Sequence, residues 1–461
     1  MVQKILKNSL AAFAFQFLNR GLGFGCFILI ARLLGIEKIG HFTYILSLCA
    51  LLTLFVEFGT NQFLVKEVAS NGGKVDATAL ISILFLKLIQ YLIGLIVLFS
   101  IEFKTLITDF TIINCLFLYV LFDSIAQTGI SILNGRKEFI KANKYSFFYE
   151  SGRSLFLLLL ILLTGSEIVI PFVYIFSAFL FSILISRKVF TINLSVGLFY
   201  PDRIFKSIKK SYRSTYLFFL AAIAFQLYFR IDIILLRRLS SEFELGVYGT
   251  AYKFFEVFLF VPAIVSGIVY PHVVEMFKSD KWKVSKYLSE IQLKSTCLLA
   301  IPVVVLILLS DFIINLFFDA SFSGAGSIMQ ILFLTSFLFC FNFVYPVLMN
   351  AGGWERNSIY TYLIGMVLNV ILNFMLIPRY GAAGAAYATL IAELFVTTIF
   401  ILFSYKEKVG FINSTALITL AVCLILVLFK VAFLALPLLL LIILFVFRTE
   451  LNWKQKLHAR G

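Results

Sequence analysis

The chain consists mainly of apolar runs that are each about as long as a membrane-spanning helix. Of its 461 residues, 61% are hydrophobic and only 14% are charged, whereas about a quarter of the residues of a typical soluble domain are charged. A helix needs about 20 consecutive apolar residues to cross the hydrocarbon core of a bilayer. The sequence therefore predicts an all-α polytopic membrane protein.

The hydropathy pattern predicts about 14 transmembrane helices. They lie near residues 9–31, 42–65, 78–101, 110–133, 146–164, 168–186, 214–236, 246–271, 293–316, 325–350, 358–377, 382–404, 412–429 and 431–447. The last two are short and are separated only by Lys430. The N-terminal apolar run is too long for a cleaved signal peptide, and we interpret it as the first span.

The distribution of Lys and Arg predicts the orientation of these spans. If the N-terminus is cytoplasmic, the cytoplasmic segments carry roughly four times as many Lys and Arg residues as the external segments, which is the pattern of multispanning proteins. Both termini are then cytoplasmic. The net charge of +15 is explained by this topology, and we expect no nucleic-acid partner.

An internal repeat divides the predicted helices into two sets of six. The sequence "RLLGIEKIGHF" (32–42) after the first span resembles "RLSSEFELGVY" (238–248) after the seventh. We therefore predict an N-terminal six-helix lobe (1–190), a basic cytoplasmic linker (191–213), a pseudo-symmetric C-terminal six-helix lobe (214–405), and two extra helices with a basic tail (406–461). Transporters commonly place the substrate between such repeats.

Several kinds of chemistry are not indicated by the sequence. The six cysteines lie in apolar runs without a CxxC pair, and the three histidines are scattered, so the sequence predicts no metal site. It contains no GxxxxGK[ST] phosphate-binding loop. We expect no cofactor and no enzymatic activity.

Polar residues at helical spacing mark candidate faces of a membrane cavity. Gln16, Asn19 and Arg20 share one face of the first predicted span, and Gln226 and Arg230 share one face of the seventh. Lys253 follows in the eighth. A charge at the centre of a bilayer costs at least about 2.5–3.5 kcal/mol. We expect these six residues to line a substrate cavity.

Some polar groups have a second interpretation. Glu57, Asp123 and Asp232 are either structural counter-ions or groups that couple transport to a cation gradient, and Asp232 is the preferred coupling group. Other polar groups, such as Asn369 with Asn373 and Lys253 with Glu256, are either part of the cavity or hydrogen-bonded contacts inside a packed bundle. The driving force, whether protons, sodium ions or membrane potential, stays open at this point.

Cationic side chains in a cavity suit an anionic ligand. Arginine offers paired N–H donors that match phosphate oxygens. We therefore predict that Arg20 and Arg230 bind the phosphate groups of the substrate.

Three stretches resemble the polysaccharide flippases of the multidrug/oligosaccharidyl-lipid/polysaccharide (MOP) superfamily. They are "NRGLGFGCFILIARLLGIEKIGHF" (19–42), "FRIDIILLRRLSSEFELGVYGTAYKFFEVFLFVPAIVSGIVYPHV" (229–273) and "LNVILNFMLIPRYGAAGAAYATLIAE" (368–393). In the third, Pro378 stops one helix, Gly381 and Gly384 permit a turn, and small residues let the next helix pack closely.

This resemblance implies both an architecture and a function. Two six-helix lobes form a V and alternate in access, and the substrate is undecaprenyl-pyrophosphate-linked oligosaccharide. The protein then serves O-antigen or other surface polysaccharide biosynthesis in the bacterial cytoplasmic (inner) membrane, within the lipid bilayer and beside other polysaccharide-assembly proteins. The two extra helices are similar to those of the lipid II flippases.

Other functions remain open from the residues. Within the same superfamily, they are a multidrug or toxin cation antiporter and a lipid II flippase. In another class, the alternative is a membrane polysaccharide polymerase or glycosyltransferase, which typically carries a large external loop or a DxD-like motif. The predicted external connections are short and show no such motif.

Overall fold

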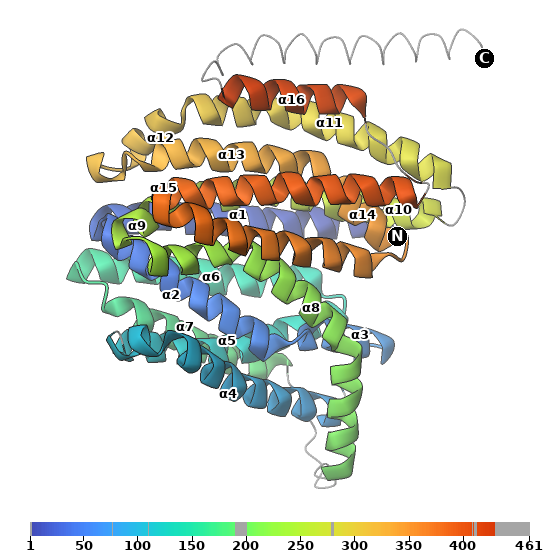
Figure 1. The fold of residues 1–461 in the computed structure, drawn as a ribbon. Helices are drawn as coiled ribbons and strands as arrows, with labels where there is room; N and C mark the ends of the chain where they lie inside the picture. Colours follow the sequence, from blue (N-terminus) through green and yellow to red (C-terminus); the bar gives the residue numbers. More distant parts are fainter. Residues whose placement is uncertain are drawn as a thin grey trace. The chain divides into compact units, whose positions relative to one another are not determined.

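We describe the protein from a computed structural model. The structure describes residues 2–75, 77–108, 110–189, 201–277, 281–407, 409 and 413–428. In this part of the chain, ten helical segments are long and apolar enough to cross a membrane. The prediction of an all-α membrane protein is therefore confirmed (Figure 1).

The helices follow one another with short connections. They are α1 (Val2–Leu34), α2 (Ile36–Glu57), α3 (Thr60–Ser70), α4 (Ala77–Thr108), α5 (Phe110–Gly135), α6 (Phe139–Thr164), α7 (Val169–Val189), α8 (Pro201–Leu239), α9 (Glu242–Phe258), α10 (Phe260–Phe277), α11 (Lys281–Leu308), α12 (Ser310–Phe317), α13 (Ala325–Asn342), α14 (Val344–Ala351), α15 (Glu355–Lys406) and α16 (Ser414–Leu428), with a short 3₁₀ helix at Ala320–Phe322.

The observed helices coincide with the predicted spans up to 412–429. Some predicted spans are divided into two consecutive helices: 42–65 into α2 and α3, 246–271 into α9 and α10, 293–316 into α11 and α12, and 325–350 into α13 and α14. The predicted span 431–447 and the basic tail lie outside the described residues.

Proline explains two of these breaks. A proline has no N–H to donate to the carbonyl four residues earlier. Pro262 therefore leaves the carbonyl of Phe258 without its helical donor, and α9 ends at Phe258. In the same way, Pro346 leaves the carbonyl of Asn342 without a donor, and α13 ends at Asn342.

The chain forms two compact units, residues 1–230 and residues 231–461. The division falls inside helix α8, directly between Arg230 and Ile231. The part of the predicted basic linker that the structure describes, residues 201–213, belongs to this same helix.

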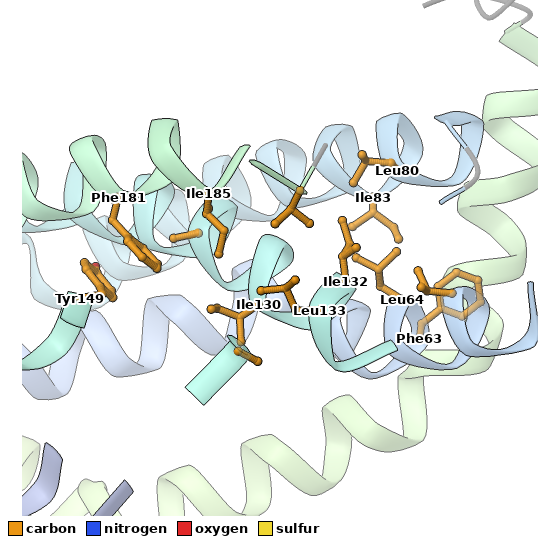
Figure 2. Close-up of a cluster of buried hydrophobic side chains, with 14 of the residues drawn as sticks. Phe63, Leu64, Leu80, Ile83, Ile130, Ile132, Leu133, Tyr149, Phe181 and Ile185 are labelled. Atoms are coloured by element: carbon orange, nitrogen blue, oxygen red, sulfur yellow. The ribbon is translucent and has the colours of Figure 1, made fainter. Parts of the chain in front are cut away.

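The first unit has an apolar core between helices α3 to α7. Phe63 and Leu64 of α3 pack with Leu80 and Ile83 of α4, and with residues of α5, α6 and α7 (Figure 2). Because lipid tails are as apolar as leucine, such a core stabilises a membrane protein through close packing and not through removal from water. One member of this core, Tyr149 of α6, also takes part in a buried polar network described below.

In the second unit, α13 is the central helix. All but a few of its side chains are buried, and it packs against α9, α11, α15 and α16. The second unit therefore surrounds α13 with helices from distant parts of the sequence.

Helix α15 is a hairpin of two arms, residues 355–380 and 382–406, that meet at Gly381 (Figure 1). Gly381 has φ 53° and ψ −130°, which residues with a Cβ rarely adopt. A Cβ on Gly384 would overlap the carbonyl oxygen of Leu376, so the arms touch closely beside the turn. The sequence predicted two helices here, 358–377 and 382–404, and this prediction is confirmed. The prediction that Pro378 stops the first helix is wrong, because Pro378 lies inside the first arm and the chain turns only at Gly381.

The carboxylate of Glu244 closes the turn of the hairpin. Its Oε2 accepts a hydrogen bond from the backbone N–H of Ala382 at 2.7 Å, which caps the first turn of the second arm. Ser241 and Glu244 form the S-x-x-E pattern of a capping box. Of the two hydrogen bonds of a capping box, the one from the Glu244 N–H to Ser241 Oγ forms, at 3.2 Å. The Glu244 side chain accepts from Ala382 of α15 instead of from the Ser241 N–H.

The substitution Gly381→Ala is expected to destabilise the second unit. The positive φ strains an alanine by about 1–3 kcal/mol, and the new Cβ would overlap the Glu244 carboxylate. We expect a loss of at least this size in the free energy of unfolding, measured by titration with SDS in mixed micelles. Gly267→Ala is the matched control, because nothing lies within 4 Å of a Cβ there. Equal stability of the two variants would contradict the strained turn.

Candidate functional site: a buried carboxylate in the second unit

Asp232 lies inside the second unit and receives hydrogen bonds from three helices or arms. Its side chain is only 1% exposed. Tyr248 of α9 and Thr389 of the second α15 arm each donate a hydroxyl to Oδ2 at 2.7 Å. Asn373 of the first arm donates its amide to Oδ1 at 2.8 Å. The carboxylate therefore connects α8, α9 and both arms of the hairpin.

The hairpin register explains how the two arms reach the same carboxylate. Asn373 and Thr389 lie the same number of residues before and after Gly381. They are therefore at the same depth on the two antiparallel arms. A change in the position of one arm relative to the other would break one of the two hydrogen bonds.

Unused polar atoms lie next to Asp232. Asn373 Nδ2 also lies 2.9 Å from the backbone oxygen and 2.7 Å from Oδ1 of Asn369, so its two N–H groups share three acceptors, one of which is Asp232 Oδ1. Both asparagines are fully buried. Within the described residues, Asn369 Nδ2 and Asn373 Oδ1 have no hydrogen-bond partner. Buried polar groups are normally paired, so the cluster has spare capacity for a small polar ligand.

No Lys or Arg of the described chain pairs with Asp232. A carboxylate that is buried in a membrane without a counter-ion is costly. Neutral donors satisfy its oxygens but leave its charge uncompensated. The arrangement therefore fits a group that binds a proton or a monovalent cation during its working cycle.

The carboxylates of the first unit are arranged differently. Glu57, at the end of α2, accepts a hydrogen bond from Asn61 Nδ2 at 2.7 Å. Asn61 Oδ1 accepts from the ammonium group of Lys87 of α4 at 2.9 Å. Lys87 is 1% exposed and also donates to the backbone oxygen of Ser124 and to Thr128 Oγ1, at 2.9 and 2.8 Å. All three of its N–H groups are thus used.

Asp123 of α5 is linked to a cation in a similar way. Its Oδ1 accepts from the hydroxyl of Tyr149 at 2.7 Å. Arg153 of α6 donates to the Tyr119 hydroxyl at 2.9 Å, and its guanidinium lies 5.2 Å from the ring centre of Tyr149 and 4.6 Å from that of Tyr174. Three aromatic rings therefore surround the arginine in cation–π contact.

One neutral side chain thus separates each first-unit carboxylate from a cation. Asn61 lies between Glu57 and Lys87, and Tyr149 between Asp123 and Arg153. The counter-ion interpretation of Glu57 and Asp123 is the one that these contacts support, whereas Asp232 lacks such a partner. The sequence analysis did not identify Lys87 or Arg153 as counter-ions, because their partners include residues of other helices.

Loss of the Lys87 charge is expected to destabilise the first unit. In Lys87→Met, the half-buried carboxylate of Glu57 loses the cation that is linked to it through Asn61, and Asn61 and Thr128 lose a buried donor. Each polar group left without its partner in this way costs about 1–3 kcal/mol. The double variant Lys87→Met/Glu57→Gln removes both charges, and it should recover about 1–3 kcal/mol of that loss. Titration with SDS measures each free energy of unfolding. If the double variant is no more stable than Lys87→Met, the two charges do not interact.

The predicted cavity residues of α1 lie against helix α6. Gln16 donates to Asn143 Oδ1 at 3.0 Å. Asn19 donates to Glu150 and accepts from Ser151 Oγ at 2.8 Å. Arg20, the next residue, is exposed. The polar face of α1 is therefore used partly for packing between helices.

The predicted cavity residues of the seventh and eighth spans have mixed surroundings. Gln226 and Arg230 of α8 are half-buried. Lys253 of α9 forms a salt bridge of 2.8 Å with Glu256, which is one of the two interpretations that the sequence left open for this pair. Arg20 and Arg230 both belong to the first unit. The assignment of these residues to substrate stays a prediction.

A metal site was not predicted, and the described residues contain no group of three or more His, Cys, Asp or Glu side chains that is suited to hold one.

Two protein families match parts of the sequence. The family described as "Polysaccharide biosynthesis protein" matches residues 5–277, more than half of the chain, and the MatE family matches residues 218–375. The probable low-salt glycan biosynthesis flippase of Haloferax volcanii is 24% identical over 84% of this chain and 80% of its own. An uncharacterized membrane protein of Methanocaldococcus jannaschii is 23% identical over 88% of this chain and 99% of its own.

Solved structures show the same fold. The lipid II flippase MurJ, in an inward closed conformation, has a TM-score of 0.72 at 17% identity, over 97% of this chain and 100% of its own. An inward-facing multidrug resistance transporter of the MATE family has a TM-score of 0.59 at 13% identity, over 85% of this chain and 94% of its own. With the family match over the first 277 residues, the chain belongs to the polysaccharide biosynthesis protein family, among the polysaccharide flippases of the MOP superfamily.

Proposed function

We propose that the protein translocates undecaprenyl-pyrophosphate-linked oligosaccharide repeat units across the bacterial cytoplasmic membrane by alternating access. The product then serves the assembly of O-antigen or another surface polysaccharide. The family match and the relative named as a glycan biosynthesis flippase support a lipid-linked glycan as the substrate. This is a transport function and not a catalytic one.

The observation that carries the proposal is the buried, uncompensated carboxylate of Asp232. A secondary transporter needs a site whose occupation by a cation changes the relative stability of two conformations. Asp232 contacts both arms of α15 and also α9, so its occupation affects how these helices pack. We therefore assign the coupling of transport to Asp232, with a proton as the cation and Na⁺ as the alternative.

Two arginines are suited to bind the anionic end of the proposed substrate. Arg20 is exposed and Arg230 is half-buried, and each presents paired N–H donors of the kind that bind phosphate. We assign the pyrophosphate of the lipid carrier to these two residues. Gln226, which lies four residues before Arg230 on α8, and Lys253 of α9 are further substrate-binding residues in our proposal.

Complementation of flippase-null strains tests the function. Strains that lack their own flippase but make different repeat units receive the gene, and surface glycan is detected by gel electrophoresis of extracted polysaccharide. Restoration in at least one strain is expected, together with loss of the cytoplasmic pool of unpolymerised lipid-linked units. A strain that lacks its polymerase instead should show no restoration. Resistance to cationic drugs without any glycan export would favour a multidrug antiporter.

The proposed orientation predicts which positions react with a membrane-impermeant thiol reagent in intact cells. In a variant without the native cysteines, Lys104→Cys lies in a predicted external segment and should be labelled. Lys206→Cys lies in the predicted cytoplasmic segment 187–213 and should react only after the membrane is permeabilised. Labelling of position 206 in intact cells would reverse the orientation.

A further inference from the structure

A second carboxylate is buried in the same helix bundle as Asp232. Glu393, on the second arm of α15, is 0% exposed. It accepts a hydrogen bond from the amide of Asn342 of α13. Asn342 is also buried, and it donates to Thr397 Oγ1 at 2.9 Å. The proposed function does not use this carboxyl group.

Glu393 is in line with the Asp232 site. Thr389, Glu393 and Thr397 are spaced by four residues, so they lie on one face of the second arm. The hydroxyl of Thr389 donates to Asp232 at 2.7 Å. Glu393 therefore lies about one helical turn, roughly 6 Å along the arm, from Thr389, a hydrogen-bond donor to Asp232.

The hairpin register brings Asn369 to the same level as Glu393. These two residues lie the same number of positions before and after Gly381. Tyr362 and Phe400 are also equally distant from Gly381, and their rings are in contact with centres 5.4 Å apart, which verifies this register. Asn369 Nδ2 is buried and has no hydrogen-bond partner in the described part of the chain. Asn369 is also close enough to Asp232 to interact with its carboxylate. Its amide is thus available beside Asp232 and, by the register, at the level of Glu393.

We propose that Glu393 is a second proton-binding group of the coupling site and exchanges one proton with Asp232. In this step an O–H bond breaks at the Asp232 carboxyl group and an O–H bond forms at Glu393, while one negative charge moves from Glu393 to Asp232. The Thr389 hydroxyl lies on the route, and the Asn369 amide turns towards the carboxylate that is ionised. The inference rests on the proposed coupling role of Asp232.

Other titratable groups of the surrounding helices belong to the same electrostatic environment. Tyr248 of α9 bonds to Asp232, and Tyr362 of the first arm interacts electrostatically with Glu393. The remaining ones on helices packed against α15 include Cys340 of α13, Tyr345 of α14, and Tyr252, Lys253 and Glu256 of α9.

Infrared spectroscopy of the full chain as a function of pH tests the proposal. The protein is placed in vesicles of phosphatidylglycerol and phosphatidylethanolamine, and the carbonyl band of protonated carboxyl groups is recorded. Subtraction of the Asp232→Asn and Glu393→Gln spectra from the wild-type spectrum isolates each band. We expect one band for each residue, and we expect the midpoint of the Asp232 band to move by about one pH unit in Glu393→Gln.

Two further variants make the test decisive. Asn342→Ala retains Glu393 but removes its donor, so it should shift the frequency of the Glu393 band even if Glu393→Gln does not fold. Asp311→Asn changes an exposed carboxyl group of the same unit and should leave both bands unchanged. Absence of a titrating Glu393 band, or an Asp232 band with the same midpoint in Glu393→Gln, would overturn the proposal. Loss of coupled transport is a separate result, which concerns only the proposed function of Asp232.

Discussion

The Asp232→Asn variant should lose at least about 99% of its transport rate while it remains folded in the membrane. An asparagine has nearly the same shape but cannot take up a proton, and it offers no negative charge to a cation. A conformational equilibrium that depends on a bound cation shifts only by the difference in cation affinity between its two states. Each tenfold loss corresponds to about 1.4 kcal/mol, so a hundredfold loss requires only a modest coupling energy.

The initial rate of surface glycan appearance, normalised to the amount of protein in the membrane, measures this effect. Some loss of stability is expected as well, because the new amide N–H₂ faces the hydroxyl donors of Tyr248 and Thr389 and leaves one of them unpaired, at a cost of about 1–3 kcal/mol. Asp311→Asn is the matched control, since it removes an exposed carboxylate of the same unit. Transport by Asp232→Asn at the rate of this control would remove the carboxylate from the coupling mechanism.

The double variant Arg20→Gln/Arg230→Gln should lose transport by at least about a hundredfold. A charge-assisted hydrogen bond contributes about 1.5–3 kcal/mol, so each single variant should lose about ten- to a hundredfold. Arg230→Lys should be intermediate, because lysine retains the charge but not the pair of N–H donors that matches a phosphate. The expected defect is weaker binding of the lipid-linked substrate and not a loss of folded protein.

Arg238→Gln is the control for this series, because Arg238 is exposed and lies on the same helix as Arg230. The rate of glycan export at several levels of substrate supply separates weak binding from slow transport. Full export by the double variant at normal expression would leave both arginines with a structural role only.

The course of the chain through the membrane was largely predictable, because the length of an apolar run and the position of Pro and Gly act locally. The hairpin at Gly381 follows from "LIPRYGAAG" in this way. The breaks after Phe258 and Asn342 are also local, since Pro262 and Pro346 each lie four residues further on. The missing N–H donor explains these two breaks but does not predict every helix end, because Pro271 and Pro302 lie inside α10 and α11 without a break.

The candidate site was predictable only in part, because its contacts join distant parts of the sequence. Asp232 stood out as a charge in an apolar run, and Asn369 with Asn373 as a polar pair. The link from Asp232 to Thr389 spans 157 residues, and nothing in the local sequence of Thr389 marks it. The counter-ions Lys87 and Arg153 were missed for the same reason, since their partners include residues of other helices.

The most direct test measures the translocation of a fluorescent undecaprenyl-pyrophosphate-linked oligosaccharide in liposomes that contain the purified protein. Gradients of protons and of Na⁺ are imposed separately, and the translocated lipid is identified by its protection from a membrane-impermeant quencher. If Asp232 couples transport to a cation, one of these gradients accelerates translocation by the wild-type protein and has no effect on Asp232→Asn. Translocation that is equally fast without a gradient, and equally fast in Asp232→Asn, would contradict this coupling.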